Sequence, residues 1–426
     1  MTRAKFPSAV AVASAVFTAA LTLVCATLAS AQTESVIHSF KTGDPAGGLV
    51  ADSSGVFYGT TYYGGQFGQG SVYKAIPPAN SGGTWTVSTL YSFSKTKRTD
   101  GGNPQGGLVL NESTRTLYGT AMIGGPNNDG VVYQLTAPTT AGAPWTQTVL
   151  YSFTGGVDGS EPAAGLVSDA KGVLYGTTFW GGQYANGVVF KLVPPATKGG
   201  AWTEVVIHSF KGGSDGRTPY ASLIFDASGS LYGTTYSGGQ GGNLGCCGTV
   251  FQLIPSGGNG PWKEVTLHRF SGAEGSAPVS SLLLDSSGAL YGTTSGFGKT
   301  NGTVFQLVPP AVAGGAWTEN TLYTFTGGAD GGTPMAAVIG DGTGALYGTT
   351  YSGGTTCNGC GTVFKLIPPA TQGAAWTEQV LHDFVGGNDG SLPLAPLLLR
   401  GNTFYGTTYY GGAVVNPAGT LFEITP

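Results

Sequence analysis

Two kinds of recurring loop carry the side chains that could bind a ligand. One loop reads Gly-Gly-x-Asp-Gly or a variant of it, and its acids are Asp44 (in a shortened first copy), Asp100, Asp158, Asp215, Glu274, Asp330 and Asp389. The other loop carries aromatic residues beside Gly-Gly pairs, namely Tyr62, Tyr63, Phe179, Trp180, Tyr236, Tyr351, Tyr409 and Tyr410. Carboxylates bind hydroxyl groups or cations, and aromatic rings stack on sugar rings or apolar groups. Together the two loops predict a ligand-binding face.

A structural role for the same residues is the competing interpretation. An Asp before Gly accepts hydrogen bonds from nearby backbone N–H groups and stabilises a turn, and aromatic side chains pack between neighbouring repeats. A residue present in every copy is explained more simply by the repeat than by one site. We retain as candidate ligand-binding residues Asp158, Trp180, Tyr62, Tyr63, Tyr236, Tyr351, Tyr409 and Tyr410.

Catalytic residues should break the repeat, because an active site is normally a single constellation. Of the 22 acidic residues, only Glu112, Asp129, Glu161, Asp383 and Glu423 fall outside three repeated positions. Asp158 and Glu161 share one loop, and two carboxyl groups about 5–9.5 Å apart would suit glycosidic cleavage. Any two nearby loop acids would look the same, so we assign no catalytic residue and keep this pair as the alternative.

The four histidines give no sign of a metal or a catalytic triad. His38, His208, His268 and His382 occupy one repeat position, where other copies have Tyr. Exchange with Tyr indicates packing and hydrogen bonding, and residues in different repeats would not converge on one ion. We therefore predict no metal and no cofactor.

Four cysteines lie beyond the N-terminal segment, as Cys246-Cys247 and Cys357-x-x-Cys360. Cys247 and Cys360 align, but their repeats are not neighbours, so a cross-link between the pairs is disfavoured. We predict a disulfide between Cys357 and Cys360 and consider a vicinal one at Cys246-Cys247, with zinc as the second interpretation of these thiols.

A sevenfold repeat must position all of these residues. The tripeptide Tyr-Gly-Thr begins at Tyr58, Tyr118, Tyr175, Tyr232, Tyr291, Tyr347 and Tyr405, which gives a unit of about 58 residues. In the third copy, four short segments rich in β-branched and aromatic residues lie at 164–169, 174–178, 188–192 and 202–210, each bounded by Gly, Pro or Asp. Four antiparallel strands per unit, repeated radially, describe a propeller blade.

The ends of the repeat array favour a closed ring over a solenoid. Residues 33–40 align with residues 203–210, so the array opens on a fourth strand, and it ends at 419–424 on a third strand. Each end supplies what the other lacks, which removes exposed sheet edges. The predicted fold is all-β: a seven-bladed β-propeller of residues 32–426, with four antiparallel strands per blade and a last blade closed by the N-terminal strand.

The sequence of the repeated unit resembles that of a known family. The unit Leu-Tyr-Gly-Thr-Thr-x-x-Gly-Gly, then Gly-Thr-Val-Phe-x-Leu-x-Pro-Pro, then Trp-Thr-Glu is similar to the GloVer tandem repeat of exported bacterial proteins, over essentially the whole chain after the N-terminal segment. The resemblance implies export and no established activity. It is also loosely similar to kelch repeats, which are propeller blades.

The N-terminus has the features of a signal peptide covering residues 1–31. Arg3 and Lys5 precede an apolar stretch, and Ala29-Ser30-Ala31 supplies small residues for cleavage after Ala31. The remaining chain is mildly acidic, which disfavours a nucleic-acid partner. We expect a secreted or periplasmic protein without a membrane span, which is a monomer.

These observations together predict a non-enzymatic exported binding module whose partner is a polysaccharide or a cell-surface protein. The alternatives are a glycan-active hydrolase or lyase on the same scaffold, and a purely structural envelope protein. Off-pattern acids at the mouth of the central channel would favour the enzyme, and a broad aromatic surface would favour binding.

Overall fold

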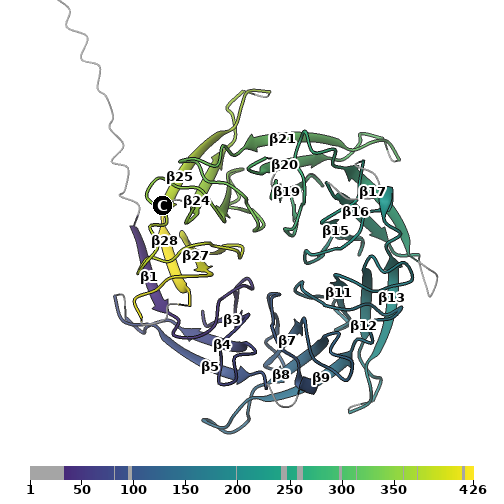
Figure 1. Cartoon of the computed structure of the whole chain (residues 1–426), viewed down its shortest axis with the longest axis vertical. Helices are drawn as coiled ribbons and strands as arrows, with labels where there is room; N and C mark the ends of the chain where they lie inside the picture. Colours follow the sequence, from purple (N-terminus) through teal and green to yellow (C-terminus); the bar gives the residue numbers. More distant parts are fainter. Residues whose placement is uncertain are drawn as a thin grey trace, which may run out of the picture. The chain divides into compact units, whose positions relative to one another are not determined.

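The computed structural model contains seven four-stranded antiparallel sheets arranged around a central channel (Figure 1). It describes residues 33–80, 82–94, 98–197, 199–240, 247–256, 262–296, 300–312, 314–357, 359–371, 373–414 and 418–426. Residues 32–426 cluster into one compact unit. The predicted seven-bladed propeller is therefore confirmed, whereas the predicted signal peptide lies outside the described residues.

Each blade contributes strands in the same order from the channel outward. The innermost strands are β2 (Val50–Ala51), β6 (Val109–Asn111), β10 (Val167–Ser168), β14 (Ile224–Phe225), β18 (Leu283–Leu284), β22 (Ile339–Gly340) and β26 (Leu398–Arg400). The second strands are β3 (Phe57–Thr61), β7 (Thr116–Ala121), β11 (Leu174–Thr178), β15 (Leu231–Thr235), β19 (Leu290–Thr294), β23 (Leu346–Thr350) and β27 (Thr403–Thr408). We number the blades 1 to 7 in this order.

The third and fourth strands complete the blades. The third strands are β4 (Ser71–Ile76), β8 (Val131–Thr136), β12 (Val188–Val193), β16 (Thr249–Ile254), β20 (Thr303–Val308), β24 (Thr362–Ile367) and β28 (Thr420–Thr425). The fourth strands are β5 (Thr86–Ser92), β9 (Thr146–Ser152), β13 (Thr203–Ser209), β17 (Lys263–Arg269), β21 (Thr318–Thr324), β25 (Thr377–Asp383) and, in blade 7, β1 (Thr33–Ser39). Short 3-10 turns η1 (Arg98–Asp100) and η2 (Gly213–Asp215) lie between blades.

The N-terminal strand closes the ring as predicted. Strand β1 pairs antiparallel with β28, from Thr33 opposite Thr425 to Ser39 opposite Thr420. In Figure 1, purple β1 lies beside yellow β28. Blade 7 therefore takes three strands from the end of the chain and one from its beginning. Its third strand, β28, is paired on both sides, with β27 and with β1.

The Tyr-Gly-Thr repeat is explained by packing at its glycine. Gly176 on β11 pairs with Phe190 on β12, and a Cβ at Gly176 would come within 2.6 Å of the Phe190 ring. The ring of Phe153, at the end of blade 2, contacts the other side of Phe190, with centroids 5.2 Å apart. The same edge-to-face contact, with centroids 4.9–5.2 Å apart, recurs at all seven junctions. The glycine of the second strand, the aromatic ring of the third strand and the Phe that follows the fourth strand of the preceding blade thus form the core that joins neighbouring blades.

Candidate functional site

Two loop sets share one face of the propeller, which we call the mouth face. The inter-blade loops join a fourth strand to the next innermost strand, and the middle loops join the second and third strands. Bridges between the two sets, such as Ser160 with Trp180 and Arg217 with Ser237, hold them together. The aromatic and acidic loops singled out from the sequence therefore do lie on the same face.

The inter-blade acids are bound within their own loops. Asp158 is 7% exposed and accepts hydrogen bonds from the Tyr151 hydroxyl (2.9 Å), the Thr154 amide (2.9 Å) and the Thr154 hydroxyl (2.5 Å). Equivalent bonds occupy Asp100, Asp215, Glu274, Asp330 and Asp389. Each of these acids stabilises the turn that begins a blade, so a ligand role for Asp158 would require displacing these partners.

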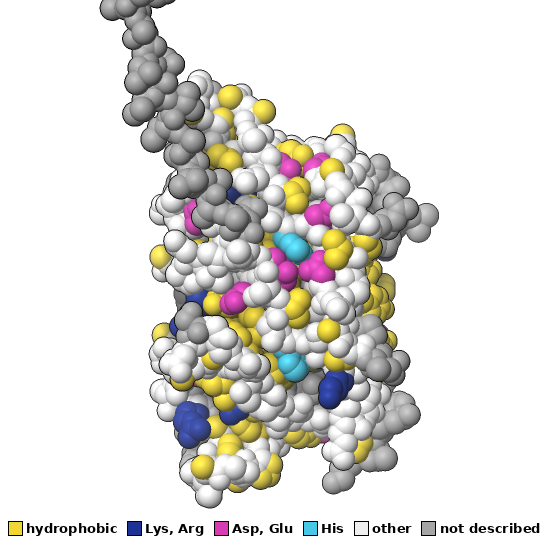
Figure 2. Space-filling view, turned by 90° about the vertical axis from the view of Figure 1, so that its left-hand side faces the viewer, with side chains coloured by type: hydrophobic (Ala, Val, Ile, Leu, Met, Phe, Trp, Pro, Cys, Tyr) yellow, Lys and Arg dark blue, Asp and Glu magenta, His cyan; other side chains and the backbone are white. Residues whose placement is uncertain are grey.

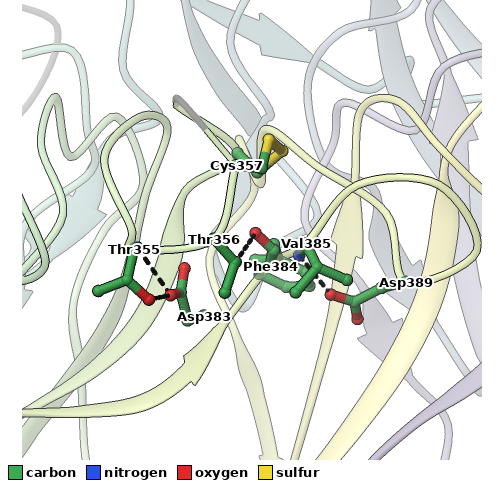
Figure 3. The surroundings of a disulfide bond; sticks show 8 residues. Thr355, Thr356, Cys357, Asp383, Phe384, Val385 and Asp389 are labelled. Carbon is green, nitrogen blue, oxygen red and sulfur yellow. Dashed lines mark hydrogen bonds between the residues drawn. A yellow bond between two sulfur atoms is a disulfide. The ribbon is translucent and has the colours of Figure 1, made fainter.

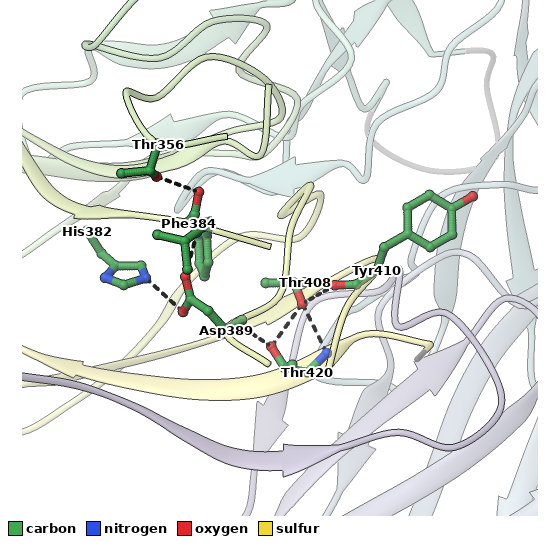
Figure 4. Close-up of polar contacts among 8 residues, drawn as sticks. Thr356, His382, Phe384, Asp389, Thr408, Tyr410 and Thr420 are labelled. Atoms are coloured by element: carbon green, nitrogen blue, oxygen red, sulfur yellow. Dashed lines mark hydrogen bonds and ion pairs between the residues drawn. The ribbon is translucent and has the colours of Figure 1, made fainter. Parts of the chain in front are cut away.

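The exchange of His with Tyr follows from the same bonds. The Tyr151 hydroxyl donates to Asp158, and in other blades His208 Nε2 lies 3.2 Å from Asp215 Oδ1. His382 Nε2 lies 3.0 Å from Asp389 Oδ1, as Figure 4 shows. Both residue types reach the same carboxylate from the fourth strand, and the packing role inferred from the sequence fits this geometry.

Asp44 is not the counterpart of Asp158. The Asp44 carbonyl accepts the backbone bond from Tyr62, as the Glu161 carbonyl does from Phe179. Asp44 therefore occupies the Glu161 position, immediately before the proline that recurs in the repeat, at Pro45 and Pro162. The sequence alignment was wrong because the first loop is short and contains only one acid. The result is that two acids, from blades 1 and 3, stand at this position.

Three middle loops carry pairs of adjacent aromatic residues, and each pair is packed edge to face. The ring centroids are 4.6 Å apart for Tyr62 and Tyr63, 4.8 Å for Phe179 and Trp180, and 4.7 Å for Tyr409 and Tyr410. The first ring of each pair is half-buried. The second is exposed, by 49% at Tyr63, 43% at Trp180 and 47% at Tyr410. We call these the aromatic pairs of blades 1, 3 and 7.

The second Thr of Tyr-Gly-Thr-Thr holds these pairs in place. Thr178 Oγ1 donates to the Trp180 carbonyl at 2.9 Å, and Thr408 Oγ1 donates to the Tyr410 carbonyl at the same distance (Figure 4). Gly181 lies against Gly159 so closely that a Cβ there would be 2.5 Å from the Gly159 Cα. The exposed rings therefore project from loops fixed by hydrogen bonds and close glycine contacts.

All five exposed aromatic side chains in the described part of the chain lie in the middle loops of blades 1, 3 and 7. Besides Tyr63, Trp180 and Tyr410, they are Phe67 and Tyr184, which are 41% and 43% exposed. Grouped exposure of large rings on one face is typical of a binding surface. Tyr236 and Tyr351, in blades 4 and 6, are half-buried single aromatics on the same face.

Polar groups from several blades meet at the channel mouth. Burial raises the pKa of Tyr62, and nearby Tyr63, Tyr220 and Glu161 raise it further. Burial raises the pKa of Asp44, against a hydrogen bond from Tyr409 that lowers it. Tyr409 in turn lies close enough to Asp44 and Tyr410 for their charges to raise its pKa beyond the effect of burial.

A hydrogen bond crosses the mouth between blades that are not neighbours. The Gln105 side-chain amide of blade 2 donates to the Tyr220 hydroxyl of blade 4. The equivalent residue of blade 3 is Ala163, whose small side chain leaves room for the bond. Both residues line a cavity of about 270 Å³ in the channel, whose other lining residues are Gly, Ala, Ser, Leu, Val, Met and Pro. The channel interior is thus uncharged over the described residues, and polar groups gather at its mouth.

The charged and larger polar side chains at the mouth lie on the side of blades 1 to 4, whereas Thr333 is the one polar residue at the equivalent positions of blades 5 to 7. Two positions flank the repeated proline. In blades 1 to 4 they carry Asp44, Ala46, Asn103, Gln105, Glu161, Ala163, Thr218 and Tyr220, and in blades 5 to 7 Ala277, Val279, Thr333, Met335, Leu392 and Leu394. Sequence analysis missed Gln105 and Tyr220. The signal was available, because these are the only polar residues that follow this proline.

Glu161 and Asp158 do not form a pair of free carboxyl groups. Burial raises the pKa of the half-buried Glu161 carboxyl, and the charge of Asp129 raises it further. Asp158, by contrast, is buried with its oxygens engaged by Tyr151 and Thr154. The acids near the mouth that are not bound within an inter-blade turn are therefore Glu161, its neighbour Asp129, and Asp44.

The predicted disulfide between Cys357 and Cys360 is confirmed, with a Cα–Cα distance of 5.5 Å. It lies in the middle loop of blade 6, where Thr355 bonds Asp383 and the Thr356 hydroxyl bonds the Phe384 carbonyl (Figure 3). The disulfide closes a short turn within this mouth-face loop, and Thr355 and Thr356 bond the loop to the end of β25 and the residue after it. Cys247 is also disulfide-bonded, and Cys246 lies outside the described residues.

These features define a β-propeller with an aromatic and acidic mouth face. The sequence profile of the Gloeobacter/Verrucomicrobia repeat matches residues 21–243, 140–313 and 247–426, so the chain belongs to that repeat family. This confirms the resemblance drawn from the Tyr-Gly-Thr unit. No curated protein matches the chain.

Solved structures show the same fold at low sequence identity. Virginiamycin B lyase from Staphylococcus aureus is 13% identical, with 93% of this chain and 99% of that chain covered and a TM-score of 0.53. A putative 6-phosphogluconolactonase from Bacteroides uniformis is 15% identical over 83% and 88% of the two chains, with a TM-score of 0.51. At such identities the likeness concerns the fold alone. Among the described residues, no helix has the length and apolarity needed to cross a membrane.

Proposed function

We propose that this protein is an exported binding module whose mouth face holds an uncharged glycan, either a polysaccharide or a glycan displayed on a cell surface. The observation that carries the proposal is the grouping of exposed rings in blades 1, 3 and 7 beside the polar groups of the channel mouth. A sugar ring has an apolar face of C–H groups and an edge of hydroxyls. The exposed rings would stack on the first, and Asp44, Glu161 and Gln105 would bind the second.

The electrostatics favour an uncharged ligand over an anionic one. Asp44 and Glu161 stand beside the repeated proline at the mouth, and among the described residues no Lys or Arg lines the channel cavity. An anionic glycan entering the channel would meet Asp44 and Glu161 at the mouth and no Lys or Arg in the described cavity lining. The Cys357–Cys360 disulfide supports an oxidising compartment, and with it the proposed secreted or periplasmic location.

The test is a glycan-array measurement on residues 32–426, with and without added calcium, followed by titration of any glycan that binds. Trp180→Ala and Tyr410→Ala should each weaken binding about 30-fold, since truncating a central aromatic contact costs about 2 kcal/mol. Val312→Ala is the control, because Val312 is 75% exposed in a loop between third and fourth strands, away from the mouth face. Absence of binding to any glycan in both conditions would refute the proposal and favour a protein partner or a structural role.

Glycan cleavage is a second candidate, favoured by the raised pKa of Glu161, because an elevated carboxyl pKa is what a general acid requires. The same glycans are incubated with the protein, and new chain ends are quantified. Cleavage that is lost in Glu161→Gln would assign an enzyme to the mouth, and Asp158→Asn tests the other acid of the same loop. Binding without new chain ends supports the non-enzymatic module.

A further inference from the structure

The junction that closes the ring brings a histidine and two carboxylates together. Glu34 lies on β1, whereas His382 lies on β25 and Asp389 in the following inter-blade loop. One ligand atom from each lies within 4.8 Å of the others, and His382 Nε2 is 3.0 Å from Asp389 Oδ1. All three side chains are half-buried. On the outer wall that contains β1 and β25, acidic side chains lie beside a histidine (Figure 2).

One oxygen of Glu34 is buried without a hydrogen-bond partner. Two of the three other His-containing junctions, those of His208 and His268, also have a Glu, and its equivalent oxygen is bonded from its own strand. Thr266 Oγ1 donates to Glu264 at 3.0 Å, and Thr321 Oγ1 donates to Glu319 at 3.0 Å. Strand β1 has Val36 at that place, which has no donor. An unpaired buried carboxylate oxygen is costly unless a cation or a proton neutralises it.

Two other junctions also contain an orphaned Glu oxygen, at Glu204 and Glu378, but they lack the histidine. There the neighbouring blade presents Tyr151 or Tyr323, whose hydroxyl already donates to its Asp. A neutral phenol is a poor ligand for a divalent ion, whereas an imidazole nitrogen is a good one. Among the described junctions, the one closed by β1 alone combines an orphaned carboxylate oxygen with a histidine.

We propose that Glu34, His382 and Asp389 bind one divalent ion of the zinc class, with water completing the coordination. Zinc accepts imidazole nitrogen and carboxylate oxygen at about 2.0–2.2 Å, and small side-chain movements would bring three atoms already within 4.8 Å to that distance. Its charge would neutralise the two neighbouring carboxylates. An open groove of about 570 Å³ beside the three residues, also lined by His38 and Asn388, gives the ion and its water ligands access.

The consequence of this site is a link between the first strand of the chain and blade 6. Strand β1 otherwise depends on its pairing with β28 and on packing at the same junction. Binding that requires the closed ring stabilises the closed ring by mass action. The site would therefore hold β1 to blade 6, next to the sheet in which β1 and β28 join the two ends of the repeat array. This inference is independent of the glycan proposal.

The experiment uses tag-free protein of residues 32–426, stripped with EDTA and titrated with zinc chloride by calorimetry. We expect one zinc per chain and a saturable rise in Tm. Glu34→Gln, which keeps the side-chain shape, and His382→Ala should each weaken zinc binding at least tenfold and remove the rise in Tm. His208→Ala, at a junction whose Glu264 oxygen is already bonded, should retain both.

Two results would overturn the proposal: no zinc binding by the unmodified protein, or unchanged stoichiometry and affinity in both Glu34→Gln and His382→Ala. The second would assign the zinc to other groups. Glu34→Gln guards against a folding defect in His382→Ala, and the Tm of each variant in EDTA shows whether the fold is intact.

Discussion

Replacing Glu204 by Gln should stabilise the propeller at high pH and leave its stability unchanged at low pH. Burial raises the pKa of the Glu204 carboxyl from 4.5 to about 7, and the nearby charge of Asp158 adds to the rise. Since the unfolded chain releases this proton at lower pH than the folded chain does, stability is lost as pH rises from 4.5 to 7. The amide carries no charge and avoids this loss.

The magnitude follows from the shift. At about 1.36 kcal/mol per pKa unit, the shift from 4.5 to about 7 sets an upper limit of about 3.4 kcal/mol above pH 7. Solvent screens this half-buried carboxyl, so we expect about 1–2 kcal/mol. Blade 2 shows that Gln fits the position, because the Gln147 amide there donates to the Asp100 carbonyl at 3.0 Å. Glu204→Gln should donate in the same way to the Asp158 carbonyl.

The assay is scanning calorimetry of both proteins at pH 4 and pH 8, with Glu112→Gln as the exposed control. We expect a higher Tm for Glu204→Gln at pH 8 and equal Tm values at pH 4. An equal gain at both pH values would show that the new hydrogen bond, not the lost charge, stabilises the variant. No gain at pH 8 would refute the raised pKa as a source of instability.

Three further substitutions test how the blades are held together, each by urea or thermal unfolding. Gly176→Ala should cost about 1–3 kcal/mol, because its Cβ would collide with the Phe190 ring; an unchanged stability would contradict the packing account of Tyr-Gly-Thr. Phe251→Ala should cost about 3–5 kcal/mol, because the fully buried ring joins two blades; a loss below 1 kcal/mol would place the junction core elsewhere. Cys360→Ser should cost about 1–2 kcal/mol, the amount expected for a disulfide that closes a short loop with Cys357; wild-type stability would show that the loop needs no cross-link.

The fold could be predicted because the sequence contains seven copies of one unit, and the strands and turns begin and end at equivalent positions in each copy. Closure was also predictable, since residues 33–40 repeat the wording of a fourth strand. The innermost strand was the exception. The apolar run at 164–169 forms only the two-residue strand β10, because Ala164 and Gly165 pack against the backbone of the neighbouring blade at the channel and do not pair in the sheet.

The site could be predicted only in part. Its aromatic pairs are evident in the sequences of the middle loops. In the structure, hydrogen bonds from Thr178 and Thr408 hold the loops that carry two of these pairs. The bond from Gln105 to Tyr220 joins residues 115 positions apart in non-adjacent blades, which no spacing within the repeat encodes. Asp44 was misplaced because a single acid in a shortened loop fits two repeat positions equally well, until backbone pairing with Tyr62 decides between them.

The division between repeated and unrepeated residues explains where a function could reside. The inter-blade acids and the Gly-aromatic stacks recur because they hold the blades together. The acids are hydrogen-bonded within the protein, and the rings are buried between neighbouring blades. Gln105 and Tyr220 have no polar counterpart in the other five blades, and the Glu161 position carries an acid only in blades 1 and 3, so blade architecture does not account for them. They lie on the arc of blades 1 to 4, opposite the apolar Val279 and Leu394 of blades 5 and 7. A ligand with one polar edge and one apolar face matches this asymmetry, and it would sit off the channel axis, against the polar arc.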